Sequence, residues 1–106
     1  MISGAGDTPV AVVTGAGRGI GRAIARRLAR DGALVVLADL NTETAGAVAS
    51  EIADAGGQAV AELLDVTDAD AVEALFERLD TRFGRLDHLV NNAGLTAGGG
   101  LKLAPP

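Results

Sequence analysis

The sequence predicts an α/β fold in which short parallel strands alternate with helices. Four short apolar runs are each bounded by glycine or polar turn residues, and three segments between them carry apolar residues at helical spacing. Because parallel strands need a crossover, which a helix supplies, this alternation predicts the order βαβαβαβ with helices on both faces of one sheet. We expect one domain over residues 10–94, preceded by a leader (1–9) and followed by an irregular tail (95–106).

The first two apolar runs predict strands that are buried on both faces. Residues 10–13 are all apolar and end at Thr14, and residues 34–38 form a second such run. Between them, residues 20–31 have helical periodicity, and Gly32 stands where a helix would stop. The apolar residues that recur at helical spacing in this segment are Ile20, Ile24 and Leu28.

Two further helices are marked by the residues at their ends. Asn41 is a favourable N-cap for a helix that ends at Gly56. Its apolar face comprises Ala45, Val48, Ala49 and Ile52. Thr67 and Asp70 have the spacing that opens a helix, which we expect to close at Gly84. Its apolar stripe, the clearest in the chain, comprises Val72, Leu75, Phe76, Leu79 and Phe83.

The remaining two strands are predicted at residues 58–64 and 86–91. Glu62 interrupts the first of them, so one face of that strand is expected to meet water, as at the edge of a sheet. In an open parallel sheet, ligands bind outside the carboxyl ends of the strands. The residues that follow each strand are therefore the candidates for a binding site.

Composition excludes several classes of function. The chain has 106 residues, a net charge of −5 and only two aromatic residues, which argues against a nucleic-acid partner. It has no cysteine, so disulfides, thiol nucleophiles and cysteine-ligated metals are excluded, and a cytoplasmic location is the expectation. His88 is the only histidine, and no second ligand at suitable spacing suggests a metal site. No apolar run is long enough for a membrane span, and we expect no secretory signal.

A glycine-rich loop lies between the first strand and the first helix, at residues 14–21. Gly15 allows a sharp turn, a side chain at Gly19 would obstruct an approaching pyrophosphate, and Gly21 favours close packing of the helix on the sheet. The N–H groups of the first helical turn would then point at phosphates. The alternative is an ordinary glycine-rich turn, so the loop predicts dinucleotide binding only in its strand–turn–helix context.

Acidic residues follow the second and third strands. Asp39 can accept hydrogen bonds from the hydroxyls of an adenosine ribose, although a capping or solvated aspartate is the alternative. Asp65 and Val66 could flank an adenine, with the carboxylate at the ring edge and the valine as apolar cover. Helix capping by the neighbouring Thr67 and Asp68 competes with that interpretation. At the end of the fourth strand, the adjacent amides of Asn91 and Asn92 could tie neighbouring loops together, and Gly94 would allow close approach of a ligand. By itself, the Asn91-Asn92-Ala93-Gly94 segment would be taken for a turn.

Together these segments resemble the short-chain dehydrogenase/reductase family, over residues 10–94. The resemblance rests on the Thr-Gly-x-x-x-Gly-Ile-Gly loop, the acidic residue at 39, Asp-Val at 65–66 and Asn-Asn-Ala-Gly at 91–94, in that order. It implies the N-terminal, cofactor-binding half of a doubly wound Rossmann fold with strand order 3-2-1-4. The cofactor-binding residues that it implies, together with the packing glycine of the loop, are Gly15, Arg18, Gly19, Ile20, Gly21, Asp39, Asp65, Val66, Asn91, Ala93 and Gly94.

The expected cofactor is NAD rather than NADP. The Asp39 carboxylate would repel a 2′-phosphate. Arg18 opposes this expectation, because the resemblance implies that a basic residue at its position holds a 2′-phosphate in some members of the family.

No catalytic residue is expected in this chain. The family's reaction uses a Tyr-x-x-x-Lys pair and a preceding serine, whereas this sequence has no tyrosine, its only lysine is Lys102, and its serines are Ser3 and Ser50. Three hypotheses stay open: a truncated or frameshifted product of an oxidoreductase gene, a stand-alone dinucleotide-binding module, and an interaction fragment. The fourth strand would expose an edge, which predicts self-association or pairing with a complementing chain.

Overall fold

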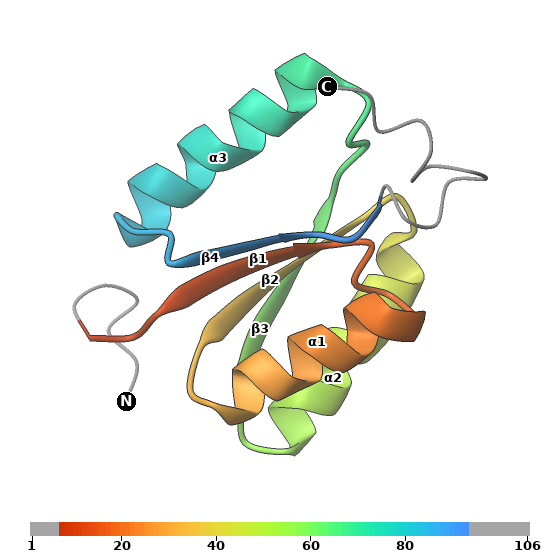
Figure 1. Cartoon of the computed structure of the whole chain (residues 1–106), viewed down its shortest axis with the longest axis vertical. Coiled ribbons are helices and arrows are strands. Elements are labelled where there is room, and N and C mark those ends of the chain that lie inside the picture. Colours follow the sequence, from red (N-terminus) through yellow and green to blue (C-terminus); the bar gives the residue numbers. More distant parts are fainter. Residues whose placement is uncertain (1–6, 94–106) are drawn as a thin grey trace.

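The computed structural model describes residues 7–93, which form one four-stranded parallel sheet with the strand order β3-β2-β1-β4. Helices α1 and α2 cover one face of the sheet, and α3 covers the other (Figure 1). The elements along the chain are β1 (Val10–Thr14), α1 (Gly19–Arg30), β2 (Leu34–Asp39), α2 (Thr42–Asp54), β3 (Gln58–Leu63), α3 (Ala69–Phe83) and β4 (His88–Asn91). The predicted fold class and strand order are confirmed. The tail and Gly94 lie outside the described residues, as do residues 1–6 of the leader.

The central strands supply both halves of the core. Alternate residues of β1 point to opposite faces: Ala11 and Val13 pack toward α1 and α2, whereas Val10 and Val12 pack toward α3. All four of these side chains are completely buried, and so are most of their neighbours on β2. Burial on both faces explains why these strands are continuous apolar runs.

Helix α1 contacts the sheet mainly through small residues. Of the apolar residues at helical spacing, Ile24 and Leu28 are partly buried, whereas the side chain of Ile20 is 66% exposed. The buried positions of this helix are Gly21, Ala25 and Ala29. Small residues let the helix lie close to the sheet, and the larger side chains therefore flank the contact instead of forming it.

The two remaining helices differ in how well their starts were predicted. Asn41 caps α2 as expected, and its Oδ1 atom accepts hydrogen bonds from the backbone N–H groups of Glu43 and Thr44 at 3.0 and 3.1 Å. In α3 the cap is Asp68, which accepts from the N–H of Ala71, so the predicted start at Thr67 is wrong. The hydroxyl and the N–H of Thr67 both donate to Asp65, so this side chain is directed toward the preceding residues of the loop.

The apolar faces of these helices and the stop signals agree with expectation. Ala45, Val48 and Ile52 of α2 are buried, and α3 buries Leu75, Leu79 and Phe83. Gly84 follows α3 in the left-handed conformation with φ 72°, and its N–H donates to the carbonyl of Asp80.

The outer strands are β3 and β4. β3 lies at one edge of the sheet and is only partly buried, as the polar interruption at Glu62 predicted. β4 begins at His88, two residues later than expected. At Asp87 the backbone N–H donates to the Val10 carbonyl at 2.8 Å, but the Val10 N–H donates to the Asp87 carboxylate, through Oδ2, at 2.8 Å. Regular pairing with β1 therefore begins with His88 opposite Ala11.

Candidate functional site

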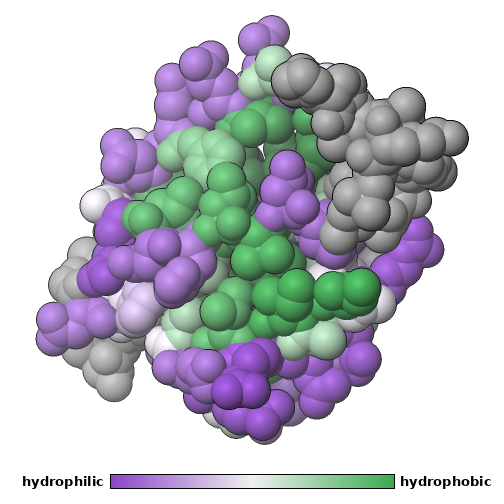
Figure 2. Space-filling model, viewed as in Figure 1, coloured by the Kyte–Doolittle hydropathy of each residue, from purple (hydrophilic) through white to green (hydrophobic). Residues whose placement is uncertain are grey.

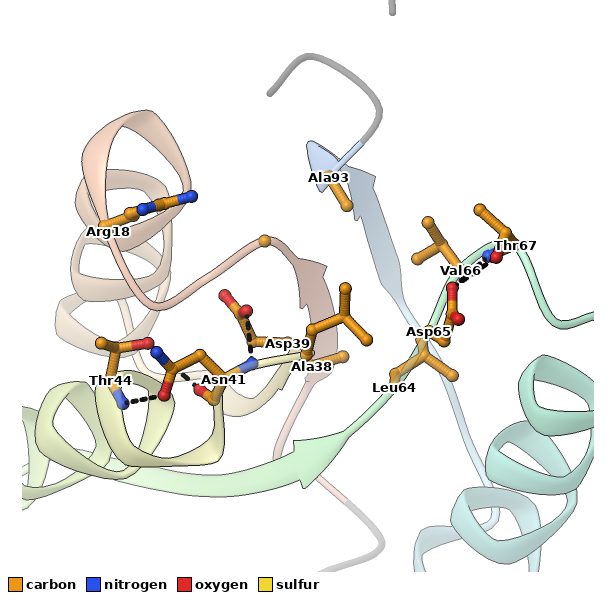
Figure 3. A pocket seen from close by; sticks show the side chains of 12 residues that line it. Arg18, Ala38, Asp39, Asn41, Thr44, Leu64, Asp65, Val66, Thr67 and Ala93 are labelled. Carbon is orange, nitrogen blue, oxygen red and sulfur yellow. Dashed lines mark hydrogen bonds between the residues drawn. The ribbon is translucent and has the colours of Figure 1, made fainter. Parts of the chain in front are cut away.

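A pocket of about 380 Å³ opens where β1, β2 and β3 end and α1 begins (Figure 3). Its floor and apolar walls come from the ends of β2 and β3, and its polar groups come from the loops that follow the three strands. The lining residues are Gly15, Arg18, Ala38, Asp39, Leu40, Asn41, Thr44, Leu64, Asp65, Val66, Thr67 and Ala93. The position matches the edge at which open parallel sheets bind ligands.

The glycine-rich loop starts with a turn that only glycine adopts readily. Gly15 has φ 64°, and its N–H donates to the carbonyl of Ala38 at 2.8 Å, which fastens the loop to the end of β2. Gly19 also has a left-handed φ, of 59°, and a Cβ atom there would meet nothing within 4 Å. Position 19 therefore favours glycine for its backbone conformation, and the space beside it is open.

Within residues 7–93, the N-terminus of α1 has no side-chain cap. Its N-cap residue, Arg18, makes no side-chain capping bond, and no acidic residue stands in the first turn. The N–H of Arg22 donates to the Arg18 carbonyl at 3.2 Å, and that bond closes the first turn. The earlier N–H groups of a helix have no intrahelical partner, and together with the helix dipole they favour an anion at this point.

Gly21 holds α1 against the loop and against the end of β4. A Cβ atom at this position would overlap the carbonyl oxygen of Gly15 and would lie 2.7 Å from Nδ2 of Asn92. The predicted packing role of Gly21 thus has a specific partner, the backbone of the turn itself.

The Asp39 carboxylate connects the glycine-rich loop to the start of α2. Its Oδ2 atom accepts the N–H of Gly17 at 2.9 Å, and its Oδ1 atom accepts the N–H of Asn41 at 3.0 Å. The side chain lines the pocket on the same side as Arg18 and Thr44 (Figure 3). A carboxylate fixed in this way presents its remaining lone pairs to a ligand in a defined direction.

Asp65 and Val66 lie across the pocket from Asp39. The Oδ1 atom of Asp65 accepts from the Thr67 hydroxyl at 2.6 Å and from the Thr67 N–H at 2.9 Å. The hydrogen bond from the Thr67 hydroxyl, and to a lesser extent the one from its N–H, hold the pKa of the Asp65 carboxyl below its usual value. The carboxylate is therefore an ionised acceptor near neutral pH. Val66 is 38% exposed and, with Leu40 and Leu64, gives the pocket an apolar wall.

The Asn-Asn-Ala segment ties the end of β4 to the end of β1. The hydroxyl of Thr14 donates to Asn91 Oδ1 at 3.1 Å and accepts from the N–H of Ala93 at 3.0 Å. Asn92 is 3% exposed, and its side-chain amide donates to the Gly15 carbonyl at 3.2 Å. These bonds hold the glycine turn in place from the side opposite to Asp39.

The structure thus brings together part of the predicted set. The predicted residues that line the pocket are Gly15, Arg18, Asp39, Asp65, Val66 and Ala93. Those that do not line it are Gly19, Ile20, Gly21 and Asn91, and Gly94 lies outside the described residues. The lining residues that were not predicted are Ala38, Leu40, Asn41, Thr44, Leu64 and Thr67. For Leu40, Asn41 and Leu64, a position just after a strand was the available signal.

Residues 7–93 lack two other kinds of functional feature. That part of the chain holds no group of three or more histidine, cysteine, aspartate or glutamate side chains that could bind a metal ion. None of its helices is long and apolar enough to cross a membrane.

Comparisons with known proteins agree with this geometry. A family model described as short chain dehydrogenase matches residues 9–104. The chain is 45% identical over 95 residues to a 3beta-hydroxysteroid dehydrogenase of Mediterraneibacter gnavus, covering 90% of this chain and 34% of that protein. It is 54% identical over 86 residues to a cis-4-hydroxycyclohexanecarboxylate dehydrogenase of Sinomonas cyclohexanicum, covering 81% of this chain and 34% of that protein.

Solved structures give the same result. A metagenomic short-chain oxidoreductase in complex with NADP matches with a TM-score of 0.75 and 47% identity over 76% of this chain and 37% of that one. A hydroxysteroid dehydrogenase from Escherichia coli matches with a TM-score of 0.76 and 42% identity over 80% of this chain and 36% of that one. The chain spans 34% of the length of the dehydrogenases from Mediterraneibacter gnavus and Sinomonas cyclohexanicum. On the evidence of sequence motifs, fold and family match together, the chain belongs to the short-chain dehydrogenase family.

Proposed function

We propose that the pocket binds NAD, and that the chain is the cofactor-binding part of an oxidoreductase that transfers hydride between nicotinamide and an alcohol or ketone. One observation carries this proposal: the uncapped N-terminus of α1 and the fixed carboxylate of Asp39 meet at the same pocket. Free N–H groups at a helix start favour phosphate binding, and a fixed carboxylate can accept hydrogen bonds from ribose hydroxyls. The absence of a side chain at Gly15, where a Cβ would lie 3.0 Å from Ala93 Cα, keeps the loop close to the end of β4.

Each predicted residue has a role in this proposal. Gly15, Arg18, Gly19 and Ile20 would contact the phosphates and the adjoining ribose. Asp39 would accept from the adenosine ribose, and Asp65 and Val66 would flank the adenine. Asn91, Ala93 and Gly94 would lie along the inner part of the cofactor, and Gly21 would support the loop. When bound, the nicotinamide would accept or supply the hydride, and residues 10–94 would serve to hold the cofactor.

The choice between NAD and NADP rests on two opposing charges. Asp39 would repel a 2′-phosphate, whereas Arg18, on the same side of the pocket, would attract it. Because Asp39 is held by two backbone N–H groups and Arg18 has a long, exposed side chain, we infer that the carboxylate dominates. Calorimetric titration with both cofactors is the test. NAD is expected to bind about tenfold more tightly, a difference of ~1.4 kcal/mol, and tighter binding of NADP would overturn the preference.

A polypeptide of these 106 residues is expected to bind the cofactor without turning it over. It has no tyrosine to serve as the proton donor or acceptor that the family uses. Steady formation of NADH from a panel of alcohols by protein free of host enzymes would contradict this expectation.

A second candidate function is an interaction module. Within residues 7–93, β4 pairs with β1 alone and forms an edge of the sheet, and Leu86 and Leu89 beside that edge are 42% and 54% exposed. Figure 2 shows apolar residues gathered across the middle of the molecular face on which β4 lies. An exposed edge with apolar neighbours favours pairing with a second copy or a complementing chain. Light scattering and thermal melting across protein concentrations test it, and a concentration-independent monomer would contradict it.

A further inference from the structure

Gly17 is a glycine of the loop whose backbone conformation does not require glycine. It is buried, and its φ lies outside the left-handed region that favours this residue. A Cβ atom at Gly17 would overlap Oγ1 of Thr44 and would lie 3.0 Å from both Thr44 Cβ and Asp39 Oδ2. The space that a side chain would occupy is therefore taken by the first turn of α2.

Thr44 is itself held in one place. Its hydroxyl donates to the Asn41 carbonyl at 3.1 Å, and its N–H donates to Oδ1 of the Asn41 side chain at 3.1 Å (Figure 3). Turning the hydroxyl away from Gly17 would break the first of these bonds. The side chain of Thr44 consequently acts as a fixed surface and not as a flexible one.

A chain of hydrogen bonds also connects Gly17 to Thr44, through Asp39 and Asn41. The Gly17 N–H donates to Asp39, the Asn41 N–H donates to the other oxygen of the same carboxylate, and Asn41 caps the turn that carries Thr44. Thr44 in turn lies in van der Waals contact with Gly17. The loop is thus held at Gly17 both by the hydrogen bond to Asp39 and by the contact with the Thr44 hydroxyl.

We infer that Thr44 is a positioning residue for the dinucleotide: through its contact with Gly17 it sets the path of the glycine-rich loop and the direction of the N–H groups at the start of α1. The inference rests on the proposed cofactor binding, to which it adds a residue of the second helix. In this arrangement, cofactor affinity depends on whether the side chains at positions 17 and 44 can pack together without steric overlap, and not on either residue alone.

A double-mutant cycle measures that fit. Gly17→Ala is expected to weaken NAD binding about tenfold or more, and Thr44→Ala about threefold or less. In the double variant the Oγ1 obstruction is gone and only the tight contacts with the Cβ atom at position 44 and with Asp39 Oδ2 remain, so affinity should recover by about threefold or more relative to Gly17→Ala. Thr44→Ser is the matched control, because it keeps Oγ1 and should not rescue Gly17→Ala. Amide chemical shifts of the loop, recorded without ligand, provide a second readout: Thr44→Ala should move the Gly17 resonance.

The outcomes separate the inference from the proposed function. If the native chain binds no NAD, the proposed function fails, and the loop shifts still decide whether Thr44 sets the loop. If the native chain binds NAD but the double variant binds as weakly as Gly17→Ala, the inference is wrong and the proposed function stands. Rescue by Thr44→Ser as complete as that by Thr44→Ala would also overturn it. Thermal melting of every variant shows whether a loss of affinity accompanies a loss of folding.

Discussion

Helices α1 and α2 both begin at the carboxyl edge of the sheet, yet their first turns are built in opposite ways. The first turn of α2 is closed by its own chain, since Asn41 accepts two of the free N–H groups. The first turn of α1 has Arg18 at the cap position and is preceded by glycines, and among the residues that the structure describes it has no side-chain cap. An uncapped helix start costs stability in an isolated chain. Under the proposed function, α1 leaves its first N–H groups available to a phosphate, whereas Asn41 satisfies the N–H groups of α2 and thereby supports the loop of α1.

Two glycines, one in each of these helices, differ in how much room there is for a side chain. Gly21 of α1 has no room for a methyl group, because the carbonyl of Gly15 fills the position. A methyl group on Gly46 of α2 would meet nothing within 4 Å, and that residue has no left-handed φ. Glycine is a packing requirement in the first helix and a replaceable residue in the second.

The largest effect is expected from alanine at these two glycines. Gly21→Ala should lower the free energy of unfolding by about 2 kcal/mol or more, because the obstructing atom belongs to the backbone of a tight turn and cannot move aside. Gly46→Ala, the matched control, should raise it by about 0.5–1 kcal/mol through better helix propensity. Urea denaturation measures both. Equal effects of the two substitutions would show that Gly21 is not confined by the turn.

The next effect concerns Asp39, which links the two helix starts. Asp39→Ala should weaken NAD binding about tenfold, since the ribose loses its acceptor and the Gly17 N–H loses its partner, and a hydrogen bond to a charged group is worth ~1.5–3 kcal/mol. The difference in affinity between NAD and NADP should narrow. Asp54→Ala, which removes an exposed carboxylate at the far end of α2, is the control and should change neither affinity. Titration calorimetry checks both ratios.

Substitution of the two cap residues tests the comparison directly. Asn41→Ala should destabilise the fold by about 1 kcal/mol, the usual cost of losing an N-cap side chain. Arg18→Ala should change stability by less than about 0.5 kcal/mol, because its exposed side chain makes no capping bond. Thermal and urea melts provide the measurement. If Arg18→Ala lowers the free energy of unfolding as much as Asn41→Ala does, the Arg18 side chain stabilises the start of α1, and that helix start is not uncapped.

The smallest effect is expected at the opposite edge of the sheet, where β4 begins beside the start of β1. Hydrogen bonds from the Arg85 side chain and then from the Val10 N–H lower the pKa of Asp87 from 3.8 to about 2. A depressed carboxyl pKa adds stability that is fully present above pH 3.8 and is lost as the pH falls from there through about 2.

Asp87→Asn should therefore flatten the acid side of the stability curve in that window. Urea melts between about pH 5 and about pH 2 measure the slope. Asp31→Asn is the control, because that carboxylate is exposed and paired at 3.2 Å with Arg27, one helical turn away, where an ion pair contributes little. An unchanged slope in Asp87→Asn would show that this carboxylate does not stabilise the junction between β4 and β1.

Much of the candidate site follows from local sequence. Thr14 to Gly21, Asp39 and the Asp65–Val66 pair could be placed after strand ends because apolar runs and helical periodicity mark where strands stop and helices begin. Asn91 illustrates the limit: its place beside the cofactor stays a prediction, and the motif did not indicate that its Oδ1 atom accepts a hydrogen bond from the Thr14 hydroxyl. That partner lies on β1, far from Asn91 along the chain, so a local pattern does not reveal it.

The alternation of strands and helices, the buried runs of β1 and β2, the cap at Asn41 and the stop at Gly84 could be predicted from the sequence, because each depends on burial or hydrogen bonding within a few residues. Three contacts could be known only from the folded chain: Thr44 confines Gly17, the Asn92 amide donates to the Gly15 carbonyl, and the Asp87 carboxylate accepts the Val10 N–H. These contacts join segments that are distant along the chain. Their geometry is set by how the helices and strands pack together, and no local pattern encodes it.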